Sequence, residues 1–189
     1  MSPRPKVALE FNTILKAAGE IADEFGMQDV SLANLAKKLG IRPPSLYNHF
    51  DGLGGLRKQL AIYGMNGLYE QLAKAAVGIS GDEAVLSISQ AYLNFARKHP
   101  GLYEATLMAP DMDEEEVQQA AARIVELTVN ILQYYQLDGD RALHAVRGLR
   151  SILHGFSALE QRGGFKMALH VDESFTMTIQ AFLTGIRKI

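Results

Sequence analysis

The chain has 189 residues, no cysteine, 48 % hydrophobic and 21 % charged residues, and a formal net charge of −2. This composition supports a sizeable apolar core and is typical of a folded globular protein, while the absence of cysteine excludes disulfides, thiolate metal sites and cysteine nucleophiles. Because the N-terminus lacks an apolar secretory stretch and no segment approaches about 18 continuous apolar residues, we expect a cytoplasmic protein with no membrane partner.

The first forty residues predict two helices. Apolar side chains recur at helical spacing over 7–25, and Gly26 ends this first helix. Ser31 is a favoured N-cap residue for a second, short helix that Gly40 stops. Residues 1–60 carry eight Lys/Arg against six Asp/Glu, whereas the rest of the chain carries eleven against fifteen. The relative positive charge therefore lies where a phosphate-contacting module requires it, although this modest asymmetry decides nothing alone.

A third helix is predicted over 43–50, because proline is tolerated in the first turn of a helix and Pro43 and Pro44 mark that turn. The connection through residues 40–42 is too tight for antiparallel packing, so the second and third helices must cross steeply, as in a helix-turn-helix. The outer face of the third helix carries small, hydroxyl, amide and imidazole groups, which hydrogen-bond to base edges and phosphates. These residues are Pro44, Ser45, Tyr47, Asn48 and His49.

This segment resembles the DNA-binding domain of the TetR family of transcriptional repressors. The resemblance covers about residues 9–62 and rests on an alanine-rich first helix ending in "FG", on "VSL" leading into "LAKKLGI", and on a serine followed by "LYNHF". It implies that Pro44, Ser45 and Asn48 read bases and that Tyr47 and His49 contact phosphates. It also implies a phosphate contact from Ser31, a backbone or base contact from Arg42 in the turn, and an N-terminal arm with Arg4 and Lys6 that follows the duplex.

Simpler roles remain open for several of these residues. Tyr47 is alternatively a core aromatic residue, His49 and Arg42 are alternatively solvated surface residues, and Ser31 is alternatively only a helix cap. The chain also departs from the family pattern, because Leu53 stands about where the family usually places a phosphate-contacting lysine. Arg57 or Lys58, one turn later, is the expected substitute.

The remaining chain also predicts helices and no strands. We therefore expect an all-α protein, with an N-terminal three-helix helix-turn-helix domain and a C-terminal helical ligand-binding and dimerisation domain. The expected division is 1–55 for the DNA-binding domain, 56–80 for a connecting helix and linker, and 81–189 for the C-terminal domain. Gly64 and Gly67 are expected to let the connecting helix bend. The predicted helices span 56–76, 82–98, 102–108, 113–135, 140–161 and 172–186, with residues 99–101 as a break.

The resemblance implies that the C-terminal domain holds a small-molecule effector and forms a homodimer through its last two helices. A two-fold dimer suits a palindromic operator. The stretch 150–165 is similar to the WHG-type C-terminal domain of one TetR subgroup, with Leu153 where that motif has tryptophan. Candidate effector-binding residues are the aromatic, thioether and imidazole groups of apolar faces, each of which is alternatively ordinary core: Tyr92, Phe95, Tyr103, Met108, Tyr134, His154 and Phe156.

Catalysis, a cofactor and a metal are not expected. No pair among the five histidines has a metal-ligand spacing such as HExxH, and neither a nucleophile elbow nor a phosphate-binding glycine loop occurs. The leading hypothesis is a repressor that a small molecule releases from operator DNA. The alternatives are an effector-independent DNA-binding protein, whose C-terminal domain serves dimerisation or protein interaction, and a helical enzyme that happens to contain the motif.

Overall fold

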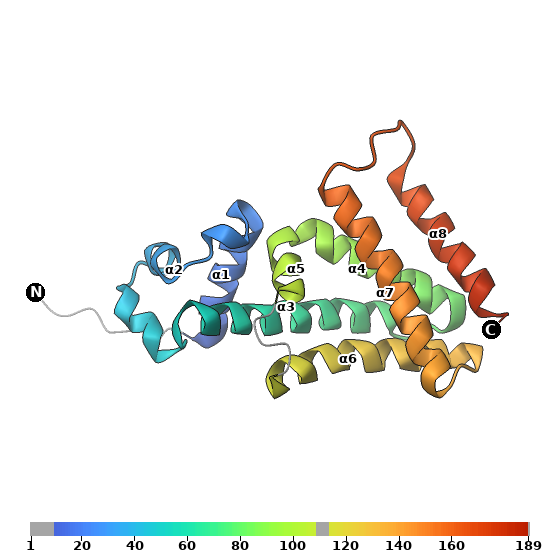
Figure 1. Ribbon diagram of the computed structural model, residues 1–189, viewed down its shortest axis with the longest axis horizontal. Helices are drawn as coiled ribbons and strands as arrows, with labels where there is room; N and C mark the ends of the chain where they lie inside the picture. Colours follow the sequence, from blue (N-terminus) through green and yellow to red (C-terminus); the bar gives the residue numbers. More distant parts are fainter. Residues whose placement is uncertain (1–9, 109–113, 189) are drawn as a thin grey trace, which may run out of the picture.

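A computed structural model describes residues 10–108 and 114–188 and confirms the all-α fold. Figure 1 shows a small head built around α1 and α2 at one end and a larger helical domain at the other. The long helix α3 runs from one to the other. The elements are α1 (Phe11–Phe25), η1 (Met27–Asp29), α2 (Leu32–Leu39), η2 (Pro43–Asn48), α3 (Gly52–Ala76), α4 (Gly81–Lys98), α5 (Pro100–Leu107), α6 (Glu115–Leu132), η3 (Gln133–Tyr135), α7 (Gly139–Gln161) and α8 (Val171–Ile186).

Most helix ends agree with the sequence prediction to within a residue or two. The first helix was expected from residue 7; α1 begins at Phe11, and residues 7–9 lie outside the described part of the chain. The prediction for the start of α3 was wrong: the helix begins at Gly52, not at residue 56. The Gly55 N–H donates to the Asp51 carbonyl at 3.2 Å, which carries the helix through the glycines.

Helix α3 is unbroken over 25 residues, so its glycines do not bend it in this structure. Gly64 instead allows close packing against α5. A Cβ at this position would lie 2.8 Å from the Thr106 methyl group and 2.9 Å from the Leu102 carbonyl oxygen. Only glycine lets the two helices approach this closely.

The C-terminal domain packs α4, α5 and α6 around α3, with α7 lying on α4 and α6 and with α8 beside α7 (Figure 1). Arg97 on α4 ties the ends of this domain together. Its guanidinium binds both carboxylate oxygens of Glu160 on α7, at 2.7 and 2.8 Å, and Asp172 on α8 at 2.5 Å. Such bidentate pairing fixes direction as well as distance. Among the described residues, no helix is both long and apolar enough to cross a bilayer.

The head contacts the C-terminal domain through α5 as well as through α3. The backbones of α1 and α5 meet at Gly101, where a Cβ would overlap the Ala22 carbonyl group. Asp23 strengthens this contact with both of its carboxylate oxygens. One accepts the Leu102 N–H at 2.8 Å, and the other lies 2.8 Å from the His99 Nδ1. The orientation of the head is therefore tied to α5.

We expect Gly101→Ala to lower the free energy of unfolding by about 1–3 kcal/mol, because the added methyl group must push two backbones apart. The measurement is urea unfolding at fixed protein concentration. Gly54→Ala is the matched control, since a Cβ there meets no atom within 4 Å; it should stabilise α3 by up to about 1 kcal/mol. Equal effects of the two substitutions would contradict this account of the α1–α5 contact.

Candidate DNA-binding surface and effector cavity

The helix-turn-helix begins with a well-capped α2. The Ser31 Oγ accepts the Asn34 N–H at 3.2 Å, so Ser31 caps this helix as predicted. At the other end, Gly40 takes the left-handed conformation (φ 65°, ψ 29°), and the Ile41 N–H donates to the Ala36 carbonyl at 3.0 Å. A residue with a side chain would be strained at Gly40, so glycine sets the sharp turn into the next element.

The third element is a 3-10 helix over Pro43–Asn48, whereas an ordinary α-helix over 43–50 was predicted. In this tighter helix the Ser45 N–H donates to the Arg42 carbonyl at 3.0 Å and the His49 N–H to the Leu46 carbonyl at 2.9 Å. Leu46 is fully buried and Phe50 nearly so, and they anchor the segment on the core of the head. The predicted DNA-contacting residues of this segment all lie on the exposed side: Arg42, Pro44, Ser45, Tyr47, Asn48 and His49.

Tyr47 is 61 % exposed, so the alternative of a core tyrosine is wrong. His49 is also exposed, and its ring centroid lies 6.3 Å from that of Phe11 on α1. Such a ring contact restricts the imidazole while leaving its nitrogens at the surface. A phosphate contact by either residue stays a prediction. Arg4 and Lys6, the predicted arm, lie outside the described residues.

The start of α3 lacks the expected cation. Leu53 is 39 % exposed in the first turn, and Lys58 does not substitute for a lysine there. The Lys58 Nζ is 2.6 Å from a carboxylate oxygen of Glu114 and 3.6 Å from one of Glu116, before and at the start of α6. Lys58 therefore joins α3 to α6. Arg57 is the other expected substitute, and its Nε is buried without a hydrogen-bond partner among the described residues.

Leu53→Lys should strengthen binding to duplex DNA roughly threefold to tenfold at low salt, because it restores a cation beside the 3-10 helix. The slope of log affinity against log salt should become steeper by about 0.9 for each additional phosphate that the variant neutralises. Val77→Lys is the control, since Val77 is 78 % exposed just beyond the other end of α3. If both variants bind more tightly to the same extent, the effect is one of net charge and the start of α3 does not face the DNA.

The C-terminal domain contains a partly open apolar cavity of about 90 Å³. Its wall comes from helices α3 to α7 and is mainly aliphatic. Thr106 and Thr128 also line the cavity, but both hydroxyls already donate to backbone carbonyls of their own helices, at 2.7 and 2.8 Å. Arg150, on α7, is the one residue with a formal charge among the described residues of the wall. An apolar chamber with few polar groups is typical of a small-molecule site.

A buried chain of hydrogen bonds lies behind one wall of the cavity. Tyr92 lines the cavity, and its hydroxyl is 2.8 Å from that of Tyr103. The Tyr103 hydroxyl is in turn 2.7 Å from the His154 Nδ1. Burial raises the pKa of both tyrosines, and the charge of Arg150 opposes part of that rise. The two hydroxyls therefore keep their protons at neutral pH and act as hydrogen-bonding groups.

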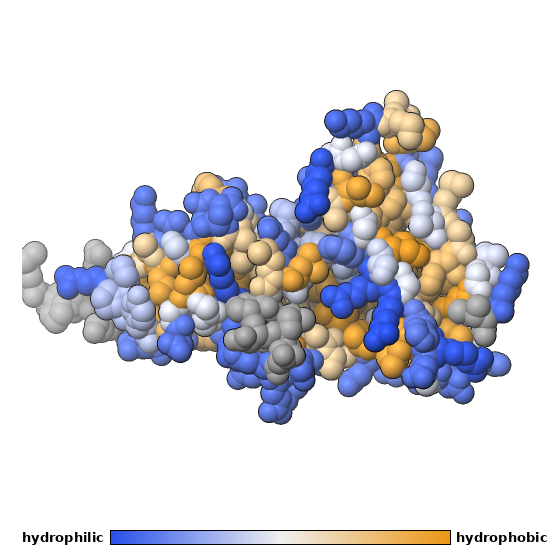
Figure 2. All heavy atoms as spheres, viewed as in Figure 1, coloured by the Kyte–Doolittle hydropathy of each residue, from blue (hydrophilic) through white to orange (hydrophobic). Residues whose placement is uncertain are grey.

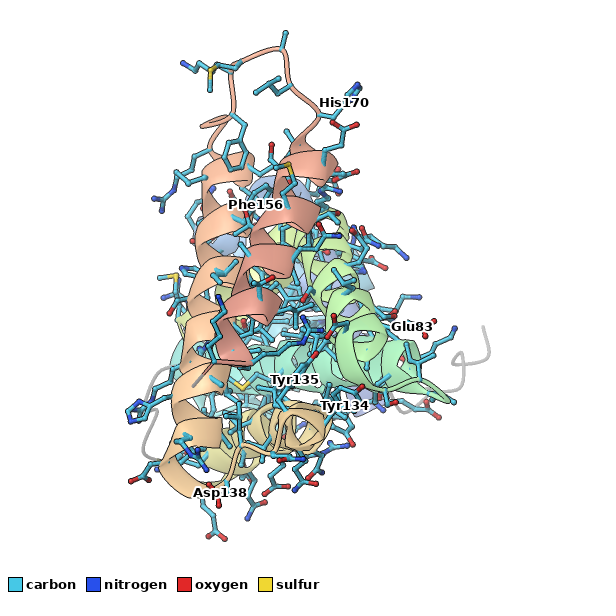
Figure 3. The ribbon with its side chains drawn as sticks, turned by 90° about the vertical axis from the view of Figure 1, so that its right-hand side faces the viewer. Glu83, Tyr134, Tyr135, Asp138, Phe156 and His170 are labelled. Carbon is cyan, nitrogen blue, oxygen red and sulfur yellow. The ribbon has the colours of Figure 1, made fainter. Side chains whose placement is uncertain are left out.

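The predicted effector-binding residues are not all brought together. Tyr92, Tyr103 and His154 form the chain just described, whereas Phe95 lines an open groove elsewhere. The Phe156 ring packs on Phe165 and Phe175 between α7 and α8. Figure 3 labels the position of Phe156. The same view places Tyr134 near the start of α4, where it is 63 % exposed; Met108 is 60 % exposed. Sequence reasoning missed the cavity-lining residues Met65, Leu68, Ile124, Thr128, Leu149 and Arg150.

The exposed helix-turn-helix surface and the apolar cavity define the protein as an all-α DNA-binding regulator with a helix-turn-helix head. The described residues hold no group of three His, Asp or Glu side chains placed to bind a metal. Residues 14–60 match the family model described as "Bacterial regulatory proteins, tetR family", and residues 85–182 match the one described as "Tetracyclin repressor-like, C-terminal domain". The chain belongs to the TetR family of transcriptional regulators. The narrower likeness to the WHG-type domain stays a prediction.

Relatives and solved structures agree with this assignment. The chain is 40 % identical over 183 residues to YobS, an HTH-type transcriptional regulator of Bacillus subtilis, covering 96 % of this chain and 95 % of YobS. The fold resembles a protein of unknown function from Rhodococcus sp. RHA1, with a TM-score of 0.82, 24 % identity and 97 % and 98 % of the two chains covered. It also resembles a TetR variant from Acinetobacter baumannii AYE solved with minocycline (TM-score 0.72, 18 % identity, 95 % and 97 % covered). The protein is a DNA-binding regulator, and members of its family are not enzymes.

Proposed function

We propose that this protein is a dimeric repressor that leaves a palindromic operator when a small molecule occupies the cavity of the C-terminal domain. One observation carries the proposal: α5 contacts both the cavity and α1 of the head that carries the DNA-reading segment. Thr106 and Leu107, at the end of α5, line the cavity. At its start, the Leu102 N–H and His99, the residue just before the helix, are held by Asp23 of the head.

The length of α5 makes this connection direct. The helix has eight residues, so at 1.5 Å per residue its two ends are only about 12 Å apart. A short helix with a tight backbone contact at Gly101 moves as a rigid piece. An effector that displaces Thr106 must therefore shift the contact with α1 and with it the DNA-reading segment. Release requires that the effector prefer this displaced arrangement.

The effector-dependent proposal is favoured over the effector-independent alternative by the cavity itself. A C-terminal domain that served only dimerisation has no need of an internal apolar space, because interiors are otherwise packed to the density of organic crystals. The TetR variant from Acinetobacter baumannii, which has the same fold, was solved in complex with minocycline. That complex supports a ligand inside this fold without identifying the ligand of this chain.

Dimerisation is supported by the surface of α7, α8 and the segment between them. Monomeric proteins rarely expose large contiguous apolar patches, and such a patch in a helical regulator favours an interface between copies. Figure 2 shows apolar surface gathered over these elements. The large apolar side chains that are exposed there include Leu143, Leu159, Phe165, Met167, Leu169 and Met177.

The decisive experiment is selection from a random-sequence duplex library at fixed salt, with the wild type and with Tyr47→Ala. Salt is fixed because phosphate-driven affinity depends steeply on it. We expect the wild type to enrich a palindromic site and to elute at the mass of two chains in light scattering. Tyr47→Ala should keep that mass and lose the enrichment. A wild type that enriches no sequence at low salt would contradict the proposal.

Asp23→Ala tests the connection between the head and α5. Removing the carboxylate leaves the Leu102 N–H without its partner and should free the head from α5, at a cost of about 1–3 kcal/mol in local opening. Hydrogen exchange is the measurement: amides of α1 and the start of α5 should lose protection about tenfold or more, while those of α7 stay unchanged.

The matched control for Asp23→Ala is Glu24→Ala. Glu24 is the next residue, is exposed and has no hydrogen-bond or salt-bridge partner among the described residues. It should leave exchange within about twofold of the wild type. If the two variants behave alike, the Asp23 contacts do not connect the head to the C-terminal domain.

A further inference from the structure

We propose that the effector is a small amphiphilic carboxylate, whose apolar body occupies the cavity and whose carboxylate pairs with Arg150. This inference rests on the proposed function in one respect, namely that the cavity is the effector site. It goes further by assigning a chemical class to the ligand and a recognition role to one residue.

The charges of the cavity favour an anion. Arg150 is among the lining residues, and within the described chain no Asp or Glu joins it in the wall. Its guanidinium makes no hydrogen bond or ion pair within the described parts of the chain, in contrast to Arg97, which is held by Glu160 and Asp172, and Arg187, which binds Asp82. Arg150 is exposed at the residue level, so it lies where the cavity meets solvent and its charge keeps its hydration.

An unpaired guanidinium beside an aliphatic chamber suits one kind of ligand. The five N–H groups of arginine form a planar fork that fits a carboxylate through two parallel hydrogen bonds. Most of the other lining side chains, including Met65, Leu68 and Leu149, are apolar and offer only van der Waals contact. A phosphate ester is disfavoured because its two negative charges require more donors than this single cation. The ligand that satisfies both parts of the site has one carboxylate and an apolar remainder.

The hydrogen-bond chain behind the wall complements the same ligand. When the His154 Nδ1 carries the proton it donates to Tyr103, Tyr103 donates to Tyr92, and the Tyr92 O–H is left free to donate toward the cavity. In the opposite direction Tyr92 donates to Tyr103 and offers no donor to a ligand. A bound carboxylate selects the first direction, since it accepts hydrogen bonds and donates none. Tyr92 then supplies a second donor to the cavity that Arg150 also lines.

The size of the cavity limits the ligand. A volume of about 90 Å³ lies well below the roughly 300 Å³ at the lower end for drug-sized molecules. It is also below the roughly 150 Å³ of an engineered apolar cavity that binds benzene. The fit is therefore to a short or compact aliphatic body, and a ring requires the walls to separate.

The test is titration calorimetry on the full chain with butanoate, hexanoate, octanoate and benzoate, each beside its own primary amide. The amide keeps the shape and removes the charge. We expect at least one carboxylate to bind and its amide to bind roughly threefold to tenfold more weakly. Arg150→Gln should weaken that carboxylate by a similar factor and leave the amide unchanged, because water screens the pair that an exposed guanidinium makes. Arg150→Lys should retain part of the affinity, because it keeps the charge without the fork.

Arg147→Gln is the matched control, since Arg147 is an exposed arginine one turn earlier on α7 and outside the cavity wall. It should bind as the wild type does, and circular dichroism and light scattering confirm that each variant folds and keeps its mass. Three outcomes overturn the inference: an amide that binds as tightly as its acid, an Arg150→Gln variant that binds like the wild type, or no binding by any carboxylate up to millimolar concentration. None of these outcomes overturns operator binding, whose failure appears separately as a lack of operator enrichment.

Discussion

The backbone contact between α1 and α5 is the constraint on which the rest of the architecture depends. Gly101 brings the two helices together without a side chain between them, and Asp23 secures the meeting point by binding the Leu102 N–H and His99. Gly64 does the same between α3 and α5. The eight-residue α5 is thus wedged between the head and the long connecting helix. Packed interfaces of this kind change by discrete shifts and do not deform continuously, so a displacement of α5 has to appear in the head.

Local sequence signals predicted the ends of elements well where a residue acts on its own backbone neighbours. Ser31 at a helix start and Gly40 in a left-handed turn are examples, because their effects need no distant partner. The start of α3 was missed because glycine disfavours helix interiors, whereas in the first turn the N–H groups lack helical partners in any case. The role of Gly64 was missed for a different reason: its partner, α5, lies about forty residues away in sequence, and no local pattern records such an approach.

The DNA-binding segment could be predicted from sequence more fully than the cavity. The exposed residues of the DNA-binding segment follow from the short spacing between buried Leu46 and Phe50, which leaves the others outside. The cavity does not follow from sequence in this way. Helical periodicity identifies a buried face but not whether that face meets other side chains or a space. Aromatic residues were therefore predicted at the cavity, and Phe156 instead fills the junction of α7 with α8, while the wall is largely aliphatic.

The small volume of the cavity bears on how a signal would be generated. An apolar body that overfills the cavity of about 90 Å³ can enter only if the wall moves, and the wall consists of α3, α4, α5, α6 and α7. Helices α3, α4, α6 and α7 are each 18 residues or longer. Helix α5 is the shortest of these five, and it also carries the Gly101 contact with the head. Under the proposed function, opening the cavity therefore displaces α5, and this displacement moves the head that carries the DNA-reading segment. Operator and effector then favour different positions of α5, and the factor by which each lowers the affinity of the other is the same by linkage.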